Sequence, residues 1–205
     1  MARYRGPRMK VCRALGTVLP GLTTAATLDR PYPPGEHGGS RRGKLSDYRI
    51  RLVEKQKMRF HYGVNEKQFK RYVAEATRRK GPTGKNLVTM LESRLDNLIW
   101  RIGLAPTIPS ARQMVVHGHI LVNGKRVDRP SYQVKAGSEL SIRPKSKEKP
   151  FVQERLDQSA SRVRPSFLEF DPATAAGKLV IAPDPNEIPV DVNTQAVIEF
   201  YSQQL

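Results

Sequence analysis

The spacing of apolar residues after position 90 predicts two short helices. The first has one apolar stripe at helical period, formed by Leu91, Leu95, Leu98, Ile99 and Ile102. Gly103 and Pro106 should end this helix, and Thr107 is the expected N-cap of the second. The second helix should turn its apolar side inward, with Gly118 as its left-handed end. That inward side consists of Ile108, Ala111, Met114 and Val115.

The next residues predict a β-hairpin. Asn123-Gly124 separates two short apolar runs, and both residues of such a turn need positive φ, which these two tolerate. A two-residue loop places Val122 opposite Lys125 and Ile120 opposite Val127. The side chains expected to face outward are Arg101, Arg112, His117, His119, Lys125 and Arg126. A rigid helix–helix–hairpin unit with a cationic face suits a nucleic-acid backbone, and a solvated charged face is the alternative.

A helix is expected over residues 47–60, with Ser46 as its N-cap and with Tyr48, Leu52 and Val53 inward. Arg51, Lys55 and Arg59 follow one another at four-residue steps. This spacing predicts a basic ridge. Its like charges repel unless an anion lies across them, and a solvated face is again the alternative.

A further helix is expected after Asn65, which forms a capping-box pattern with Gln68. It should bury four side chains, Phe69, Tyr72, Val73 and Ala76. Its basic end at 78–80 offsets the helix dipole, so these cations have a structural explanation too. Another helix should begin near Thr83 or Gly84 and merge into the stretch at 91–102.

The remaining segments predict loops and short elements. Residues 1–44 lack periodicity and should be irregular, ordering on an anionic partner. A charged connector is expected at 145–149 and a short helix at 151–162. The apolar run 196–201 should dock on a core. Short strands are expected at 131–134, 138–142, 166–170 and 178–181.

Charge is distributed unevenly along the chain. The formal net charge of the 205 residues is +17. Residues 1–80 contain 20 basic and 6 acidic residues, whereas residues 151–205 contain 4 and 8. This asymmetry indicates a polyanionic partner such as nucleic acid or an acidic membrane. With no membrane-spanning run, no signal peptide and one cysteine, the expected location is the cytoplasm.

No arrangement of residues in the sequence predicts catalysis. The chain has no phosphate-binding glycine loop, and Cys12 has no paired base. His117 and His119 flank a glycine but lack the further ligands of a zinc site, so we expect no metal and no cofactor. Glu92 and Asp96 are interpreted as helix-face residues without acid–base duty.

Motifs along almost the whole chain resemble the bacterial small-subunit ribosomal protein S-four family, in a form without zinc. They are PPGEHG at 33–38, LSDY at 45–48, EKQK at 54–57, YGVNEKQF at 62–69, LESRLDN at 91–97, ARQMVVHGHILVNGKRV at 111–127, SYQV at 131–134 and IEFYS at 198–202. Residues 92–155 look like the RNA-binding module of this family, which some pseudouridine synthases and tyrosyl-tRNA synthetases share. The N-terminal motifs exclude those enzymes.

The resemblance implies an α+β fold with two lobes. Residues 1–90 would form a basic extension and a helical lobe, joined by the tail 196–205. Residues 91–195 would hold the helix–helix–hairpin module and a small antiparallel sheet. It also implies a structural role, in which the protein binds the 5′ domain of small-subunit ribosomal RNA early at a multi-helix junction. The protein would lie near the channel through which mRNA enters and would contact ribosomal protein S-five, affecting decoding accuracy.

The resemblance and the charge pattern together assign the RNA contacts. The candidates are Arg3, Arg5, Arg8, Arg13, Tyr48, Arg49, Arg51, Lys55, Lys57, Arg59, Arg101, Arg112, His117, His119, Asn123, Lys125 and Arg126. Arg41, Arg42 and Lys44 are assigned to mRNA. In two departures, Cys12 stands without the other cysteines of zinc-binding relatives, and Ile108 stands where relatives usually have a basic residue.

Two other functions are possible from the sequence. An RNA-modifying enzyme would carry the same module, but it would need a catalytic domain that the short, proline-rich 151–205 segment does not supply. A peripheral membrane protein would also suit the charge. A structural RNA binder should lose affinity steeply with salt, with a log–log slope near −7 for about eight phosphate contacts.

Overall fold

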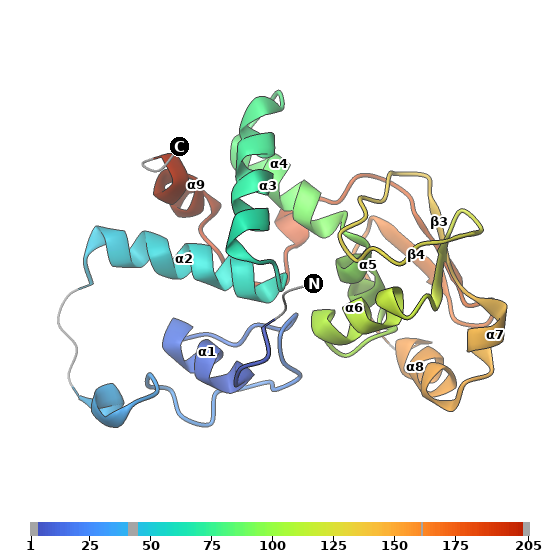
Figure 1. The fold of residues 1–205 in the computed structure, drawn as a ribbon, viewed down its shortest axis with the longest axis horizontal. Helices are drawn as coiled ribbons and strands as arrows, with labels where there is room; N and C mark the ends of the chain where they lie inside the picture. The colour runs from blue at the N-terminus through green and yellow to red at the C-terminus, as the bar shows by residue number, and fades with distance from the viewer. Residues whose placement is uncertain (1–3, 41–44, 161, 203–205) are drawn as a thin grey trace. The chain divides into compact units, whose positions relative to one another are not determined.

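The computed structural model describes residues 4–40, 45–160 and 162–202. These residues form nine α-helices, two short 3-10 helices and one five-stranded sheet (Figure 1). The fold class is therefore α+β, as predicted. The chain divides into two compact units. Unit 1 comprises residues 1–87 and 189–205, and unit 2 comprises residues 88–188.

Unit 1 is helical. Its elements are α1 (Arg8–Leu15), η1 (Glu36–Gly39), α2 (Asp47–His61), α3 (Glu66–Arg78), the first part of α4 (Thr83–Glu92) and α9 (Thr194–Ser202). The predicted caps are confirmed: Ser46 Oγ accepts a hydrogen bond from the Arg49 amide at 3.3 Å, and Asn65 Oδ1 accepts one from the Gln68 amide at 2.8 Å. Helix α3 buries the four side chains expected of it.

The C-terminal apolar run forms α9, which packs against α2 and α3 as expected of a docked segment. Phe200 and Tyr201 are buried in this contact. The expectation that Tyr48 points inward is wrong. Its ring lies 5.7 Å from that of Phe200, but 57% of the residue is exposed, because Tyr48 stands in the first turn of α2 where packing covers only part of the ring.

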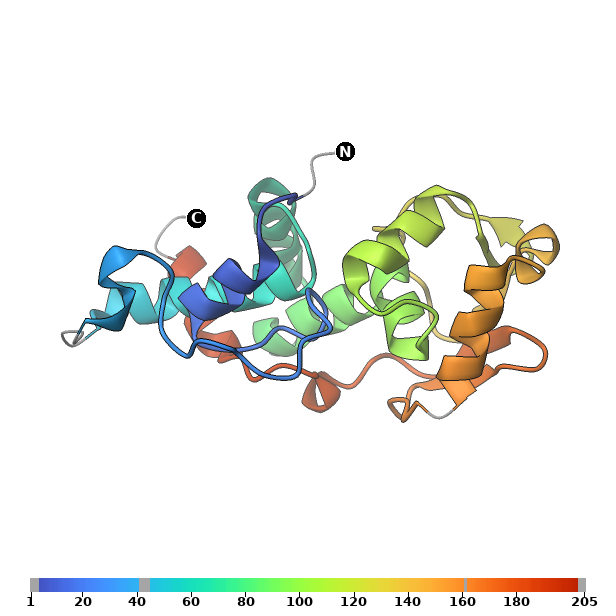
Figure 2. The same ribbon diagram turned by 90° about the horizontal axis from the view of Figure 1, so that it is seen from below.

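The N-terminal segment is not irregular throughout. Helix α1 forms there and ends at Gly16, whose φ is 73°. An isolated helix of 8 residues is unstable in water, so α1 depends on packing, and Cys12 is fully buried. In Figures 1 and 2, α1 runs beside α2. The sequence pattern missed this helix because one buried residue makes no apolar stripe.

Unit 2 combines helices with the sheet. Its remaining elements are α5 (Leu95–Ile102), α6 (Ile108–Val116), β1 (Ile120–Val122), β2 (Lys125–Arg126), β3 (Glu139–Ile142), α7 (Pro144–Lys147), α8 (Pro150–Ala160), β4 (Leu168–Asp171), β5 (Ala176–Leu179) and η2 (Pro185–Glu187). The strand order is β2-β1-β3-β5-β4, and all pairs are antiparallel. Helix α7 replaces the expected connector at 145–149.

The predicted hairpin is confirmed. Val122 pairs with Lys125, and the Val127 amide donates to the Ile120 carbonyl at 3.4 Å. Asn123 and Gly124 have φ values of 49° and 74°, as the two-residue turn requires. Thr107 caps α6 as expected. Residues close in sequence, the Thr107 cap and the Asn123-Gly124 turn, therefore determine where α6 begins and where the hairpin turns.

One expected helix is broken. Instead of merging, α4 ends at Glu92, and Arg94 is extended before α5 begins. Residues 130–134 explain the break, because carbonyls of this segment accept hydrogen bonds from the first amides of α5. The Leu95 amide donates to Tyr132 at 2.9 Å, and the Asp96 amide donates to Pro130 at 3.1 Å. The strand expected at 131–134 is thus a capping segment with one isolated bridge, Arg94 to Gln133.

The strands β4 and β5 lie close to where the apolar pattern placed them. Gly177 lies within β5 and pairs with Phe170. A Cβ at Gly177 would clash with the Phe170 ring and with the Glu169 carbonyl, so the close approach of the two strands requires glycine here.

Candidate nucleic-acid interface

The basic ridge on α2 faces carboxylates of the same chain. Lys55, its central residue, is only 5% exposed, and its Nζ lies 2.9 Å from Glu66 Oε1. The same ammonium group lies 4.7 Å from the centre of the Phe200 ring. The expectation that Lys55 points outward is therefore wrong, because α3 and α9 cover this side of α2.

The neighbouring cations of α2 are paired as well. Arg51 Nε lies 2.9 Å from Glu199 Oε2, and Arg59 Nε lies 3.6 Å from Glu66 Oε2. Lys57 Nζ lies 2.7 Å from Glu54 Oε1. The anions that offset the repulsion within the ridge are carboxylates of the same chain, Glu66 on α3 and Glu199 on α9. Arg51, Lys57 and Arg59 keep only part of their side chains exposed.

Glu66 is the electrostatic centre of this contact. Burial raises the pKa of Glu66, but hydrogen bonds from Tyr201 and Lys55, together with the charges of Lys55 and Arg59, bring the pKa below its ordinary value of 4.5. Burial and the Glu66 carboxylate raise the pKa of Tyr201, so its hydroxyl stays protonated and donates to Glu66. Through Glu66, the side chains of Lys55 and Tyr201 connect α2, α3 and α9.

Arg101 in unit 2 is also turned inward, contrary to prediction. It is 9% exposed, and its Nε lies 2.9 Å from Glu92 Oε2. It also donates to the Glu187 carbonyl at 2.6 Å. Glu92 is fully buried and accepts a second hydrogen bond, from Asn97 at 2.9 Å. A buried carboxylate needs such partners, so Arg101 serves the fold.

Arg112 belongs to a second internal network. Its Nη2 lies 3.1 Å from Asp96 Oδ2, and Asp96 also receives two hydrogen bonds from Arg94 at 3.0 and 2.7 Å. Asp96 and Arg94 are fully buried, and 15% of the Arg112 side chain is exposed. Ile108, on the same helix as Arg112, is 1% exposed and offers no surface contact.

The hairpin presents cations that are not paired in this way. Lys125 and Arg126 are exposed, and within the described residues neither has a carboxylate within ion-pair distance. The guanidinium of Arg126 lies over Gly118, where a Cβ would collide with it. Asn123 anchors the turn to β3, since its Oδ1 accepts a hydrogen bond from the Glu139 amide at 2.8 Å. The two cations are therefore carried by a fixed backbone.

Two histidines lie beside the hairpin. His117 is exposed, and its ring centroid is 6.0 Å from that of the half-buried His119. His119 Nδ1 lies 2.9 Å from Ser146 Oγ. Burial lowers the pKa of His119, and the charges of Lys149, His117 and Arg143 lower it further. Arg143 and Lys149 are cations that motif reading missed, because they are near His119 only in the folded chain.

The arginine candidates of unit 1 outside the ridge differ in exposure and in hydrogen bonding. Arg5, Arg8 and Arg49 are exposed, although Arg8 donates to the Leu22 carbonyl at 3.3 Å. Arg13 is half-buried, donates to the Tyr32 carbonyl at 3.1 Å and stacks on the Tyr32 ring at 5.1 Å. It thereby shapes the proline-rich loop. Four candidates, Arg3, Arg41, Arg42 and Lys44, lie outside the described residues.

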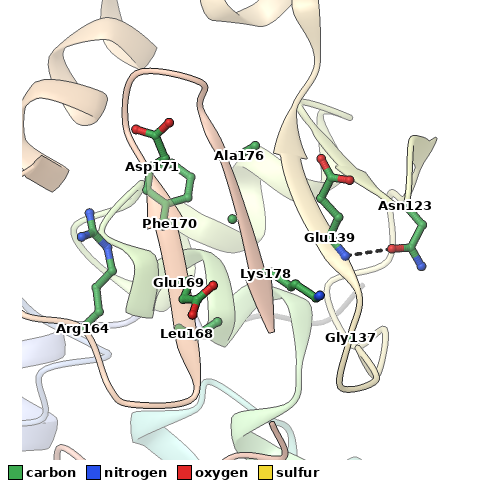
Figure 3. Close-up of a pocket in the computed structure, with 11 residues that line it drawn as sticks. Asn123, Gly137, Glu139, Arg164, Leu168, Glu169, Phe170, Asp171, Ala176 and Lys178 are labelled. Carbon is green, nitrogen blue, oxygen red and sulfur yellow. Dashed lines mark hydrogen bonds between the residues drawn. The ribbon is translucent and has the colours of Figure 1, made fainter. Parts of the chain in front are cut away.

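The outer face of the sheet has the opposite character (Figure 3). A hollow of about 840 Å³ lies over β3, β5 and β4. Glu139, Glu169 and Asp171 line it, and Lys178 pairs in register with both glutamates. Arg164 lines the hollow as well, so its three carboxylates face two cations and it has no excess of positive charge to attract phosphate.

Among the described residues, no helix has the length and apolar character that crossing a membrane requires.

Comparisons with known proteins agree with the family resemblance. Residues 3–92 match the family model described as ribosomal protein S4/S9 N-terminal domain, and residues 93–140 match the S4 domain. The chain is 47% identical to small ribosomal subunit protein uS4 of Geobacillus stearothermophilus over 203 residues, which cover 99% of this chain and all of that protein.

Relatives from other bacteria carry the same name. The chain is 46% identical to the uS4 protein of Thermosynechococcus vestitus and 48% identical to that of Trichodesmium erythraeum, and both matches cover 100% of each chain. This is a family of ribosomal structural proteins, so the chain is not an RNA-modifying enzyme. With its S4 domain and this similarity along almost its whole length, the chain belongs to the uS4 family of small ribosomal subunit proteins.

Proposed function

We propose that this chain is a structural constituent of the small ribosomal subunit in the cytoplasm, where it binds the 5′ domain of small-subunit ribosomal RNA at a multi-helix junction. The exposed pair Lys125 and Arg126 carries this proposal. These cations stand on a turn that is held to β3, and no carboxylate within the described residues competes with phosphate for them.

The hairpin would recognise the RNA backbone. Lys125 and Arg126 would neutralise phosphates and release counterions, while His117 and His119 would donate or accept hydrogen bonds beside them. The deep groove of A-form RNA is closed to side chains, so the shape of the junction would provide most of the specificity. A fixed backbone suits that role, because little conformational entropy is lost on binding.

Unit 1 would contribute a separate set of cations. Arg5, Arg8 and Arg49 are exposed and, within the described part of the chain, have no carboxylate partner. Arg51, Lys55, Lys57 and Arg59 are occupied by Glu199, Glu66 and Glu54. We therefore assign the RNA contacts of this unit to the unpaired arginines and regard the paired ones as part of the fold.

Three finer roles belong to the same proposal. The protein would bind early and nucleate assembly of the 5′ domain. It would lie near the channel through which mRNA enters, with Arg41, Arg42 and Lys44 facing the mRNA. It would also contact ribosomal protein S-five and so influence decoding accuracy. Each role is supported by the resemblance along the whole chain, and each would be seen as a separate footprint or crosslink.

Chemical footprinting on 5′-domain RNA tests the proposal. The full-length protein should protect backbone positions at one multi-helix junction, and Lys125→Ala with Arg126→Ala should remove part of this protection. Lys178→Ala is the matched control, since Lys178 is an exposed cation of the same unit on the acidic face. No protection by the wild-type protein, or equal loss with the control variant, would contradict the proposed function.

A further inference from the structure

An exposed aromatic ring lies beside the two histidines. Phe151, in the first turn of α8, is 42% exposed. Its ring centroid lies 5.6 Å from that of His119, at an interplanar angle of 63°. His119 in turn contacts His117 edge-to-face. Three rings from the end of α6, the start of β1 and α8 thus form a continuous group, with Phe151 at one end.

Phe151 is not needed to hold α8 in place. Val152 is fully buried and Leu156 is 7% exposed, so these two residues anchor the helix to unit 2. A phenylalanine that leaves so much of its surface in water contributes little to the core compared with these residues. Its exposure therefore leaves the ring available to a ligand.

The ring has positively charged surroundings. Residues 143–149, RPKSKEK, contain four cations and one carboxylate, Glu148. Arg143 and Lys149 lie close enough to His119 to lower its pKa. Neither of these two cations forms an ion pair with a carboxylate of the described chain. An aromatic face beside unpaired cations matches the way proteins bind unpaired nucleotides, with the base stacked and its phosphates neutralised.

We propose that Phe151 is a stacking platform for one unpaired base of the ribosomal RNA, with Arg143 and Lys149 holding the flanking phosphates. This inference rests on the proposed function, since it assumes that the chain binds RNA. It places an RNA contact on α8, which follows the residues matched to the S4 domain at 93–140. It also assigns an extruded nucleotide, rather than a paired helix alone, to the recognised structure.

Substitution of Phe151 tests the platform by affinity. Phe151→Ala should weaken binding of the full-length protein to 5′-domain RNA roughly 5- to 150-fold, the effect of losing one stacked base. The salt dependence should not change, because no phosphate contact is removed. Phe151→Tyr should bind like the wild type. Ile181→Ala is the control, since Ile181 is also an exposed apolar residue of unit 2, at 52%.

A fluorescence measurement tests the stacking directly. Phe151→Trp should bind RNA, and its indole emission should be quenched by the stacked base. Ile181→Trp should bind without quenching, and the buried Trp100 provides the same background in both variants.

The outcomes separate the two proposals. If the wild-type protein does not bind 5′-domain RNA, the proposed function fails and the platform fails with it. If the wild-type protein binds but Phe151→Ala binds equally well, or the new indole is not quenched, only the platform is overturned. Quenching by neighbouring ribosomal proteins without RNA would also overturn it, because the ring would then be a protein contact.

Discussion

The ammonium group of Lys55 and the carboxylate of Glu66 lie 2.9 Å apart, with the Lys55 side chain 6% exposed and the Glu66 side chain 48% exposed. A buried cation against a half-exposed anion joins α2 to α3, and the Phe200 ring of α9 covers it at 4.7 Å. This ion pair explains why a lysine in a row of basic residues serves the fold. Lys55, like the other paired cations of α2, stabilises unit 1, whereas Arg49 on the same helix is exposed and has no carboxylate partner among the described residues.

Lys55→Ala should destabilise unit 1. The substitution removes a hydrogen bond between charged groups and its packing on Phe200, so the free energy of unfolding should fall by about 1.5–3 kcal/mol. Hydrogen exchange should show faster opening of α2 and α9. Arg49→Ala is the control, since the exposed Arg49 should change stability by less than about 0.5 kcal/mol but weaken RNA binding. A stable Lys55→Ala protein with lower RNA affinity would restore Lys55 to the RNA surface.

The ion pair between Arg51 and Glu199 should show measurable coupling. A double-mutant cycle with Arg51→Ala and Glu199→Ala should give a coupling free energy of about 0.2–1 kcal/mol, because both side chains are partly exposed, at 31% and 43%. Thermal unfolding of the four proteins provides the measurement. Lys178→Ala, an exposed cation of unit 2, should show no coupling to Arg51. A coupling of zero between Arg51 and Glu199 would mean that the guanidinium is free in solution.

Unit 1 should lose stability in acid through Glu66. The pKa of Glu66 in the folded chain is below its ordinary value of 4.5, so the unfolded chain takes up the proton first. The stabilising contribution is therefore fully present well above pH 4.5 and is lost as the pH falls through the folded pKa. Thermal unfolding across this range should show a weaker pH dependence for Glu66→Gln than for the wild type. An equal dependence in both proteins would assign the acid sensitivity to other carboxylates.

Glu92→Gln should destabilise unit 2 strongly. The change leaves the Arg101 charge buried without its carboxylate, which costs about 3–5 kcal/mol. Replacing both residues, Glu92→Leu with Arg101→Met, should restore most of this loss, because neither charge of this pair is then left buried without its partner. Urea unfolding followed by the fluorescence of Trp100, the single tryptophan of the chain, provides the measurement. If Glu92→Gln unfolds at the same urea concentration as the wild type, the ion pair between Glu92 and Arg101 does not stabilise the fold.

Lys125→Ala should weaken RNA binding and lower the salt dependence. Each lost phosphate contact should reduce the magnitude of the log–log slope by about one, while the free energy of unfolding remains unchanged. Nitrocellulose filter binding to 5′-domain RNA at several salt concentrations provides both values. Lys178→Ala, on the acidic face of the sheet, should leave the slope unchanged. An unchanged slope for Lys125→Ala would remove the hairpin tip from the RNA contact.

Short-range signals predicted much of the fold. Ser46, Asn65 and Thr107 cap their helices, and Asn123-Gly124 forms the hairpin turn, because each of these contacts lies within a few residues of the chain. The family resemblance, carried by motifs along the whole length, is confirmed by the comparisons. The sequence alone thus determined the fold class, the hairpin and the family.

Only the tertiary structure decided which cations are exposed and which are paired with carboxylates of the same chain. Arg51 meets a carboxylate 148 positions away, and Arg101 meets one 9 positions away on another helix. The break between α4 and α5 depends on residues 130–134, which no local pattern connects to it. A basic residue looks the same in a sequence whether it faces phosphate or a carboxylate of its own chain. The physical reason is that ion pairing depends on distances of a few ångströms, and only packing brings residues remote in sequence to such distances.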